Sequence, residues 1–346
     1  MRQDKPEGEL KRGWTTGACA TAAVKAAFWA LRVGTFPDPV SITLPKGEQP
    51  AFALALAEKG DGWARVGIIK DAGDDPDVTH GAMIIATVTL GGEGVRFKAG
   101  EGVGTVTKAG LPLAVGEPAI NPVPRAMMVA EIEALGGGGV EIEISIPGGV
   151  EIAQKTWNGR LGIVGGLSIL GTTGIVHPFS CAAWISSIHR GIDVARAAGF
   201  AHVAACTGST SEDAVRAHFG LPLEAMLDMG DFVGGVLKYL RSHPVPRITI
   251  GGGFGKVVKL AQGHMDLHSG RSQVDFAWLA TRAPFAVKDK VLGANTALEV
   301  LELCGPAMAA QVAQEAQAQS AKVVADVNMT VDVMIISRDG KIIAHA

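Results

Sequence analysis

Apolar residues recur at helical spacing near the start of the chain and then alternate at strand spacing. Ala20, Val24, Phe28 and Leu31 fall on one face of a helix. Between residues 40 and 90 the apolar segments are short and strand-like, as in a sheet with antiparallel members. This pattern predicts an N-terminal α+β domain with a mixed sheet.

The second half of the chain alternates strand-like and helical segments more regularly. HVAACT, from residue 202, and RITIGG, from residue 247, are strand-like, and each precedes a loop and a helical pattern. Such alternation is typical of a parallel sheet whose ligand-binding loops follow the carboxyl ends of the strands. Near the end of the chain, Asp339 and Gly340 predict a hairpin because Asp-Gly favours tight turns.

A change of pattern separates the two halves. The strand-like segment EIEISI is followed by the turn residues Pro147, Gly148 and Gly149. We place a domain boundary there. The sequence predicts an α+β domain over residues 1–150 and a Rossmann-like α/β domain over residues 151–346.

Glycines are concentrated in NGRLGIVGGLSILGTTG, residues 158–174, ahead of a predicted helix from residue 177 to residue 198. Glycine lets a ligand approach main-chain N–H groups, and a helix start leaves such groups unpaired. We therefore interpret the segment as a binding loop for an anionic or polar ligand, although its spacing does not match the dinucleotide fingerprint G-x-G-x-x-G. A mobile connector between domains is the alternative.

Two further loops have a similar character: TGST, residues 207–210, and GGGFGK, residues 251–256. We expect them to converge with the glycine-rich segment on one crevice. The last of them is not a Walker A loop, because Lys256 is followed by Val257 and not by Ser or Thr. Asp231 is a candidate for binding ribose hydroxyls, with helix capping as the alternative.

Candidate acid–base residues occur in two stretches. KDAGDDPDVTHG, residues 70–81, does not follow the calcium-loop pattern, so one of its carboxylates could orient a substrate N–H or accept a proton beside His80. Asx-turns are the alternative. His264 and His268 lie four residues apart in a glycine-rich loop with no identifiable third ligand, which favours a polar substrate contact over a metal site.

Anion-binding candidates lie in the N-terminal half. Thr15 or Thr16 is predicted to cap the first helix, and the start of that helix is a candidate for receiving a ligand carboxylate. Lys108 and Arg125, in a turn-rich run, suit a substrate bearing carboxylates. Solvated loop charges are the alternative for each of these cations.

Composition excludes several classes of protein. The 346 residues are 47% hydrophobic and 19% charged, which is enough for buried cores and two domains. A net charge of −3 gives no general attraction to nucleic acid, and the absence of an eighteen-residue apolar run argues against a membrane protein. The charged start predicts no export, and four widely spaced cysteines fit a reducing cytoplasm. The sequence leaves open whether the chain forms a homo-oligomer.

Taken together, several segments resemble the CbiD-type cobalt-precorrin-5B methyltransferases of anaerobic cobalamin (vitamin B12) biosynthesis. The matching segments span most of the chain in family order: RGWTTGACATAAVKAA, KDAGDDPDVTHG, GEGVGTVTKAGL, GEPAINPVPRAMM, NGRLGIVGGLSILGTTGIVHPFS and ITIGGGFGKVVKLAQG with its following His-Ser. The resemblance implies methyl transfer from S-adenosylmethionine to ring carbon 1 of cobalt-precorrin-5B, a polycarboxylated corrin precursor. The products would be cobalt-precorrin-6A and S-adenosylhomocysteine, with cobalt present only as part of the substrate.

Site roles follow by inference for the matching positions. The expected donor-binding residues are Gly162, Gly165, Gly166, Thr172, Thr207, Gly208, Asp231, Gly252 and Gly253. The expected substrate-binding residues are Thr15, Thr16, Gly17, Lys108 and Arg125. The expected polar contacts near the reacting ring are Asp71, Asp74 and His268.

Two other functions fit the same features. A nicotinamide- or flavin-dependent oxidoreductase acting on a tetrapyrrole would also use glycine loops on an α/β sheet, but the missing G-x-G-x-x-G argues against it. A non-catalytic tetrapyrrole carrier would bind the macrocycle and show no affinity for a methyl donor.

Overall fold

The computed structural model describes residues 8–346. Residues 1–7, on which part of the expectation about export rests, lie outside the described part. Between residue 8 and the chain end, no helix combines the length and the apolar character that a membrane crossing requires.

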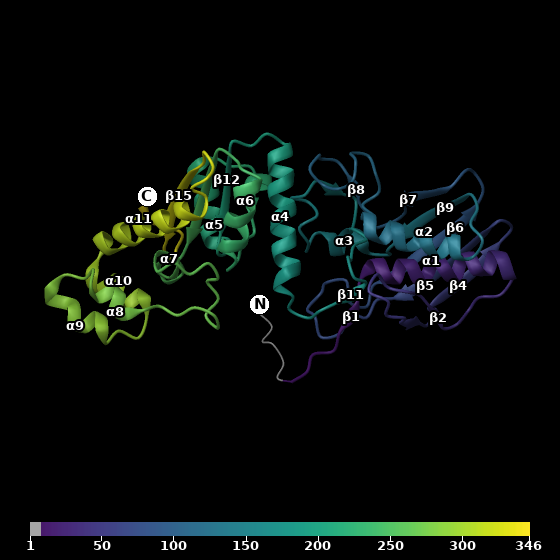
Figure 1. Cartoon of the computed structure of the whole chain (residues 1–346), viewed down its shortest axis with the longest axis horizontal. Coiled ribbons are helices and arrows are strands. Elements are labelled where there is room, and N and C mark those ends of the chain that lie inside the picture. Colours follow the sequence, from purple (N-terminus) through teal and green to yellow (C-terminus); the bar gives the residue numbers. More distant parts are fainter. Residues whose placement is uncertain (1–7) are drawn as a thin grey trace. The chain divides into compact units, whose positions relative to one another are not determined.

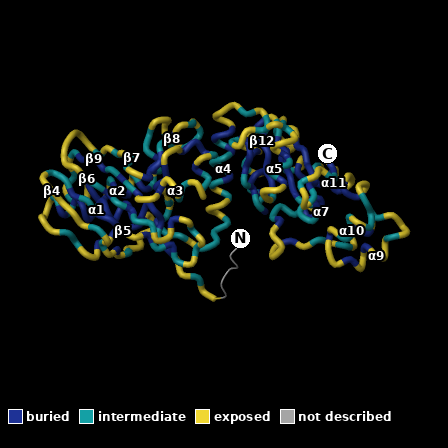
Figure 2. Tube along the Cα trace, turned by 180° about the vertical axis from the view of Figure 1, so that it is seen from behind, coloured by how far each residue is buried: buried dark blue, intermediate teal, exposed yellow. Residues whose placement is uncertain are grey.

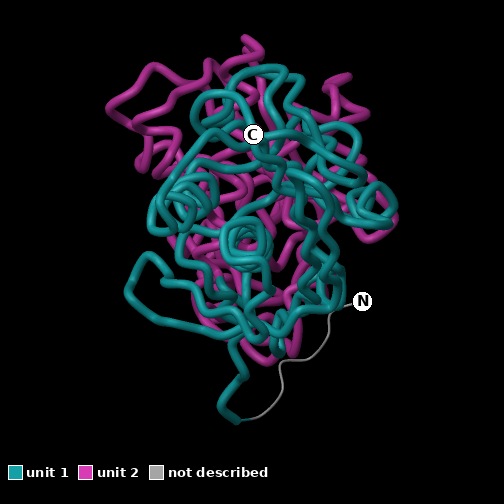
Figure 3. Tube along the Cα trace, turned by 90° about the vertical axis from the view of Figure 1, so that its right-hand side faces the viewer, with its two compact units in different colours: residues 1–180 teal, residues 181–346 magenta. Residues whose placement is uncertain are grey.

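The chain divides into two compact units, residues 1–180 (unit 1) and residues 181–346 (unit 2), shown in Figure 3. The boundary therefore lies further along the chain than the position near residue 150 predicted from the sequence. The reason is that Ile163 and Ile175 still pair with strands of unit 1.

Unit 1 is built on a five-stranded mixed sheet in the order β4-β5-β6-β9-β7 (Figure 1). Neighbouring strands are antiparallel from β4 to β9, and β7 runs parallel to β9. Buried and more exposed residues alternate along β6 and β9, so one face of the sheet is covered. The predicted mixed sheet is confirmed. The strands are β4 (Leu56–Gly60), β5 (Trp63–Ile69), β6 (Met83–Leu90), β7 (Val95–Ala99) and β9 (Val140–Ser145).

Helix α1 (Thr16–Val33) packs on this sheet beside α2 (Pro122–Ala134). Alanines make up much of α1, and their small side chains let the helix be buried on most sides, as Figure 2 shows. Thr15 caps the helix by accepting a hydrogen bond from Ala18 N–H at 3.1 Å, and Gly34 ends it in a left-handed conformation. The predicted cap is confirmed.

Three short antiparallel pairs complete unit 1, together with α3 (Gly149–Ala153). They are β1 (Gly13–Trp14) with β11 (Ile175–Val176), β8 (Thr105–Val106) with β10 (Ile163–Val164), and β2 (Val40–Ser41) with β3 (Ala51–Phe52). The first two pairs tie the glycine-rich segment, residues 158–174, to unit 1. This corrects its expected place in the C-terminal domain.

Unit 2 contains a second five-stranded sheet, in the order β13-β12-β14-β15-β16. The first four strands in this order are parallel, and β16 pairs antiparallel with β15, which confirms the predicted hairpin. Among the parallel strands the chain order is 2-1-3-4, as in doubly wound sheets of the flavodoxin type. The strands are β12 (His202–Cys206), β13 (Met226–Leu227), β14 (Arg247–Gly252), β15 (Thr330–Ile336) and β16 (Ile342–His345).

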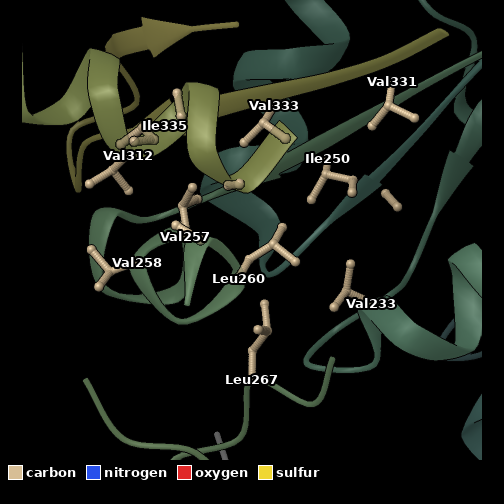
Figure 4. Close-up of a cluster of buried hydrophobic side chains, with 14 of the residues drawn as sticks. Val233, Ile250, Val257, Val258, Leu260, Leu267, Val312, Val331, Val333 and Ile335 are labelled. Carbon is tan, nitrogen blue, oxygen red and sulfur yellow. The ribbon is translucent and has the colours of Figure 1, made fainter. Parts of the chain in front are cut away.

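Helices cover both faces of this sheet. Helix α5 packs on one face, where Val215 joins a small core with Cys206 and Met334. Helices α4, α6, α7 and α11 pack on the other face around a larger core, part of which Figure 4 shows. The helices are α4 (Cys181–Ala197), α5 (Ser209–Phe219), η1 (Leu223–Ala225), α6 (Val233–Ser242), α7 (Phe254–Ala261), α8 (Phe276–Ala280), η2 (Phe285–Val287), α9 (Lys288–Leu292), α10 (Ala297–Cys304) and α11 (Pro306–Val323).

A buried ion pair fixes the acidic loop of unit 1. Lys70, whose side chain is 1% exposed, donates to Asp77 Oδ2 at 2.7 Å, and Thr79 donates to Asp77 Oδ1 through both its N–H and its hydroxyl. Burial acts to raise the pKa of Asp77, but the charge of Lys70 and these hydrogen bonds outweigh it and lower the pKa. The carboxylate therefore stabilises the loop in its ionised form.

Substituting Asp77→Asn should lower the free energy of unfolding by about 3 kcal/mol at pH 7, because it leaves the buried Lys70 ammonium without its counter-charge. The pKa of Asp77 is lower in the folded chain than in the unfolded one. The stabilisation by its carboxylate is therefore fully present at pH values above about 3.9, the ordinary pKa of an aspartate. That stabilisation is lost as the pH falls through the folded-state pKa. Urea unfolding curves of the variant and the natural chain should therefore converge in acid.

The matched control is Asp339→Asn, which removes a carboxylate from the exposed pair with Lys341. Exposed ion pairs contribute little to the free energy of unfolding, so this variant should be as stable as the natural chain at pH 7. Equal stability of Asp77→Asn and Asp339→Asn would show that the Lys70 pair does not hold the loop.

Candidate functional site

The carboxyl ends of β12 and β14 form the candidate ligand site of unit 2. The chain leaves β12 into α5 on one face of the sheet and leaves β14 into α7 on the other face. In doubly wound sheets, ligands bind in the crevice where neighbouring strands feed helices on opposite faces. The loops at this point are residues 207–208 and Gly253, and both were selected from the sequence.

These two loops are in direct contact. Thr207 N–H donates to Gly251 C=O at 2.9 Å, and a Cβ built on Gly252 would lie 2.9 Å from Thr207 Oγ1. By contrast, a Cβ on Gly208 would meet no atom within 4 Å, and one on Gly253 would have no neighbour closer than 4.0 Å. The main chain at Gly208 and Gly253 is therefore open to a ligand.

Both helices that begin here lack a side-chain cap, because Gly208 precedes α5 and Gly253 precedes α7. The first N–H groups of a helix are then available to an anionic group, which the helix dipole also favours. Below them, burial raises the pKa of Cys206 to about 12, so its thiol stays neutral and supplies no nucleophile. The loops after β12 and β14 are suited to binding an anion through main-chain groups.

Asp231, expected to bind ribose hydroxyls, holds the segment after α7. Its carboxylate is 7% exposed and accepts a hydrogen bond from Lys256 Nζ at 2.5 Å. Lys256 also donates to Leu267 C=O at 2.9 Å, and Leu267 N–H donates to Asp231 C=O at 2.8 Å. This geometry assigns Asp231 a structural role, and the ribose contact stays a prediction.

The three residues expected near the reacting ring lie in different units. Asp71 accepts a hydrogen bond from Lys11 Nζ, and Asp74 accepts one from Lys11 N–H, both at 2.6 Å. The hydrogen bond from Lys11 lowers the pKa of Asp71, which makes it a weak base. His268, in unit 2, accepts a hydrogen bond from Gly270 N–H at 3.1 Å. Their catalytic roles stay predictions.

The start of α1 is occupied by the chain itself. Gly17 N–H donates to Leu170 C=O at 2.9 Å, and Thr16 Oγ1 accepts from Leu170 N–H at 3.0 Å. Thr15 is used as the cap, and all three predicted residues are buried. The start of α1, expected to receive a substrate carboxylate, therefore contacts the glycine-rich segment instead. A backbone carbonyl of that segment accepts the hydrogen bond that a carboxylate would otherwise accept.

Arg125 is also used internally. Its Nε donates to Ile120 C=O at 2.8 Å, a second guanidinium nitrogen donates to Pro118 C=O at 3.1 Å, and a third pairs with Glu117 at 2.9 Å. Together these contacts fix the loop ahead of α2. The geometry favours this structural role over the expected carboxylate clamp.

Close packing explains two glycines of the glycine-rich segment. A Cβ on Gly166 would lie 2.2 Å from Gly102 O, and one on Gly162 would lie 2.5 Å from Lys108 Cγ. Lys108 therefore packs against the segment through its stem. Both glycines are buried and serve the packing of unit 1.

Gly165 and Thr172 are exposed in the same segment. A Cβ on Gly165 would meet no atom, although its φ of +89° disfavours other residues. These two residues belong to unit 1, whereas the loops after β12 and β14 belong to unit 2. The expected convergence of all three loops stays a prediction.

A groove in unit 2 was not anticipated from the sequence. It has a volume of about 490 Å³ and lies between α4, α6 and the segment after α7. Beside it stands Trp184, which is 47% exposed. Trp184 continues the four-residue spacing of the buried Ile188 and Ile192, so its sequence pattern predicts a core residue and gives no signal of a surface site.

No metal centre is evident in the part of the chain that the structure describes, where no three His, Cys, Asp or Glu side chains are grouped to hold an ion. Among the described residues, His264 and His268 are not part of such a group.

Open loops at the switch point of a mainly parallel sheet are typical of α/β ligand-binding domains, and in this chain an α+β unit precedes that sheet. A family profile described as CbiD matches residues 3–178, and one described as the CbiD C-terminal domain matches residues 266–346. The chain belongs to the CbiD family, and like its relatives it is a methyltransferase.

Relatives match over nearly the whole chain. A protein of Paramagnetospirillum magneticum is 60% identical, covering 98% of this chain and 99% of its own length, and one of Brucella anthropi is 60% identical, covering 99% and 97%. Both are named cobalt-precorrin-5B C(1)-methyltransferase. The crystal structure of the cobalamin biosynthesis protein CbiD from Archaeoglobus fulgidus is 29% identical and covers 77% of this chain and 84% of that one. The TM-score between the two structures is 0.41.

Replacing Gly166 by Ala should lower the free energy of unfolding by about 3 kcal/mol, because the added methyl group collides with Gly102 O. Gly165→Ala is the matched control in the neighbouring position. It meets no atom and should cost only about 1 kcal/mol through its positive φ. Urea unfolding measures both. If the two variants were equally stable, close packing would not explain the glycine-rich segment.

Proposed function

We propose that the chain methylates ring carbon 1 of cobalt-precorrin-5B, with S-adenosylmethionine as donor, giving cobalt-precorrin-6A and S-adenosylhomocysteine. The family and the names of relatives at 60% identity support the reaction. The observation that carries the donor site is the open main chain at Gly208 and Gly253, at the switch point of the unit 2 sheet. On this proposal unit 2 acts as a Rossmann-like donor-binding domain.

The two loops suit one end of such a donor. S-adenosylmethionine supplies a methyl group on a sulfonium that is already electrophilic, and its methionine part carries a carboxylate. The uncapped starts of α5 and α7 offer N–H groups to that carboxylate. The hydroxyl of Thr207 lies at the contact between the two loops, and on this proposal it would orient the donor.

The protein has mainly to position the reacting groups. Bound in line, the macrocycle carbon forms the new bond to the methyl carbon while the bond to sulfur breaks and its electron pair stays on sulfur. The neutral thiol of Cys206 and the ionised carboxylate of Asp71 agree with a reaction that relies on alignment and exclusion of water. The cobalt belongs to the substrate.

The other residues expected to contact donor or substrate are candidates on the grounds of the sequence alone. Gly165, Thr172 and Lys108 in unit 1 are candidates for contact with donor or substrate. Asp74 and His268 are candidates for polar contacts with the macrocycle. The proposed function does not depend on any of these residues.

Gly253→Val should weaken binding of S-adenosylhomocysteine at least about tenfold while leaving the unfolding curve unchanged, because the valine fills space that no protein atom occupies. Isothermal calorimetry measures the affinity. The control is Gly293→Val, at an exposed glycine after α9 that belongs to no candidate loop. If the folded Gly253→Val variant bound S-adenosylhomocysteine as tightly as the natural chain, this loop would not be part of the donor site.

The same titration separates the alternative functions. The natural chain should bind S-adenosylmethionine and S-adenosylhomocysteine, and not NADH or NADPH. Binding of the nicotinamides alone would favour an oxidoreductase. Binding of a tetrapyrrole without any affinity for the methyl donor would favour a carrier.

A further inference from the structure

The groove of unit 2 has the size and lining of a ligand site. Its volume of about 490 Å³ falls within the range of roughly 300–1,000 Å³ typical of small-molecule pockets. Mainly apolar surface lines it, with a few polar groups. The lining residues are Ile185, His189, Phe232, Gly234, Gly235, Lys238, Tyr239, Ser242, Met265, Asp266 and Arg271.

Trp184 extends this lining as a fixed aromatic surface. Its indole N–H donates to Asp228 C=O at 2.9 Å, and its ring lies 6.3 Å from that of Phe232, which lines the groove. A half-exposed tryptophan held by a hydrogen bond loses little conformational freedom when a flat ligand packs on it. The aromatic surface therefore continues from the groove onto α4.

Stacked rings stiffen one wall. His189 stacks on Tyr239 and Tyr239 stacks on His243, with ring centroids 3.9 Å apart in both pairs. The Tyr239 hydroxyl donates to Asp193 at 2.7 Å, which fixes the stack between α4 and α6. Burial lowers the pKa of His189, which favours the neutral form of its imidazole.

The charge at the rim is positive. Lys238 is exposed beside the groove and makes no ion pair with any residue between 8 and 346. Arg271 donates to Asp266 at 2.6 Å and to Cys181 Sγ at 3.2 Å, which ties the segment after α7 to the start of α4. The buried side chain of Leu267 anchors the same segment in the core, as Figure 4 shows. The groove is thus a built surface with one unpaired cation.

We infer that the surface formed by Trp184, Phe232 and the α4–α6 groove binds one edge of the corrin macrocycle, with Lys238 meeting a peripheral carboxylate. The inference rests on the proposed function and assigns the substrate a site in unit 2. Flat aromatic walls match the apolar faces of a conjugated macrocycle, and the unpaired cation matches its carboxylates. An open groove of this volume holds an edge of such a ligand and leaves the rest accessible.

The test uses the full chain and a stable probe, cobalt(III) uroporphyrin, a metallated tetrapyrrole with eight carboxylates. Quenching of tryptophan fluorescence on titration gives its affinity. Trp184→Ala should weaken binding about tenfold, which corresponds to about 1.4 kcal/mol. Lys238→Ala should weaken it several-fold and make it less dependent on salt, since an exposed charge is screened by ions. As Lys238 is exposed, this second variant tests the site without disturbing the fold.

Two controls make the result specific. Phe285→Ala removes a fully exposed aromatic side chain of unit 2 outside the groove and should leave affinity unchanged. Dicyanocobinamide, whose side chains are amides, should bind more weakly than the carboxylated probe and should not respond to Lys238→Ala. Natural affinity for cobalt uroporphyrin in both Trp184→Ala and Lys238→Ala would overturn the inference.

Titration with S-adenosylhomocysteine distinguishes this inference from the proposed function. Its affinity should be the same in the natural chain, Trp184→Ala and Lys238→Ala. If the donor failed to bind any of them while the probe still distinguished the variants, the proposed function would fail and the macrocycle site would stand. If Trp184→Ala weakened binding of S-adenosylhomocysteine and left the affinity for cobalt uroporphyrin unchanged, the groove would bind the donor and the inference would be wrong. If the natural chain self-associated and Trp184→Ala abolished this without changing the affinity for the probe, the groove would bind a second copy of the chain and the inference would again be wrong.

Discussion

The parallel pairing of β12 with β14 is the constraint on which the candidate donor site depends. Their register runs from His202 opposite Arg247 to Cys206 opposite Gly251, so the two strands end within one residue of each other. Gly251 has no side chain because a Cβ there would lie 2.8 Å from Cys206 Sγ. A shift by one residue would turn these side chains to the other face and separate the loops. The closeness of the two loops is therefore a consequence of how closely the two strands pack.

The glycines of the two units serve different purposes that look alike in a sequence. Gly166 is needed because another segment of the same chain passes close to it, whereas Gly253 has open space in front of it. Both kinds of site consist of a glycine among apolar residues. Only the atoms around each position distinguish packing from ligand access, and those atoms come from distant parts of the chain.

Local signals in the sequence predicted much of the fold. The Thr15 cap, the hairpin at the chain end, and β12 and β14 with their loops depend on neighbouring residues, and all were found. The boundary at residue 180 was missed because it is set by strand pairs between distant segments. The internal contacts of Arg125, with two backbone carbonyls and the Glu117 carboxylate, were not predicted because they give no signal in the sequence. Trp184 gave no signal, since a residue on a buried helical stripe is expected in the core.

Unit 1 is closed by the pairing of its own first and last strands, β1 with β11. During synthesis this pair cannot form until Ile175 and Val176 have left the ribosome, yet the strand ladders of unit 1 need no residue beyond them. Domains generally fold as units, the N-terminal one first. The first half of the chain can thus complete its hydrogen-bonded structure while the second half is still being translated, which shortens the time that its strand edges are exposed.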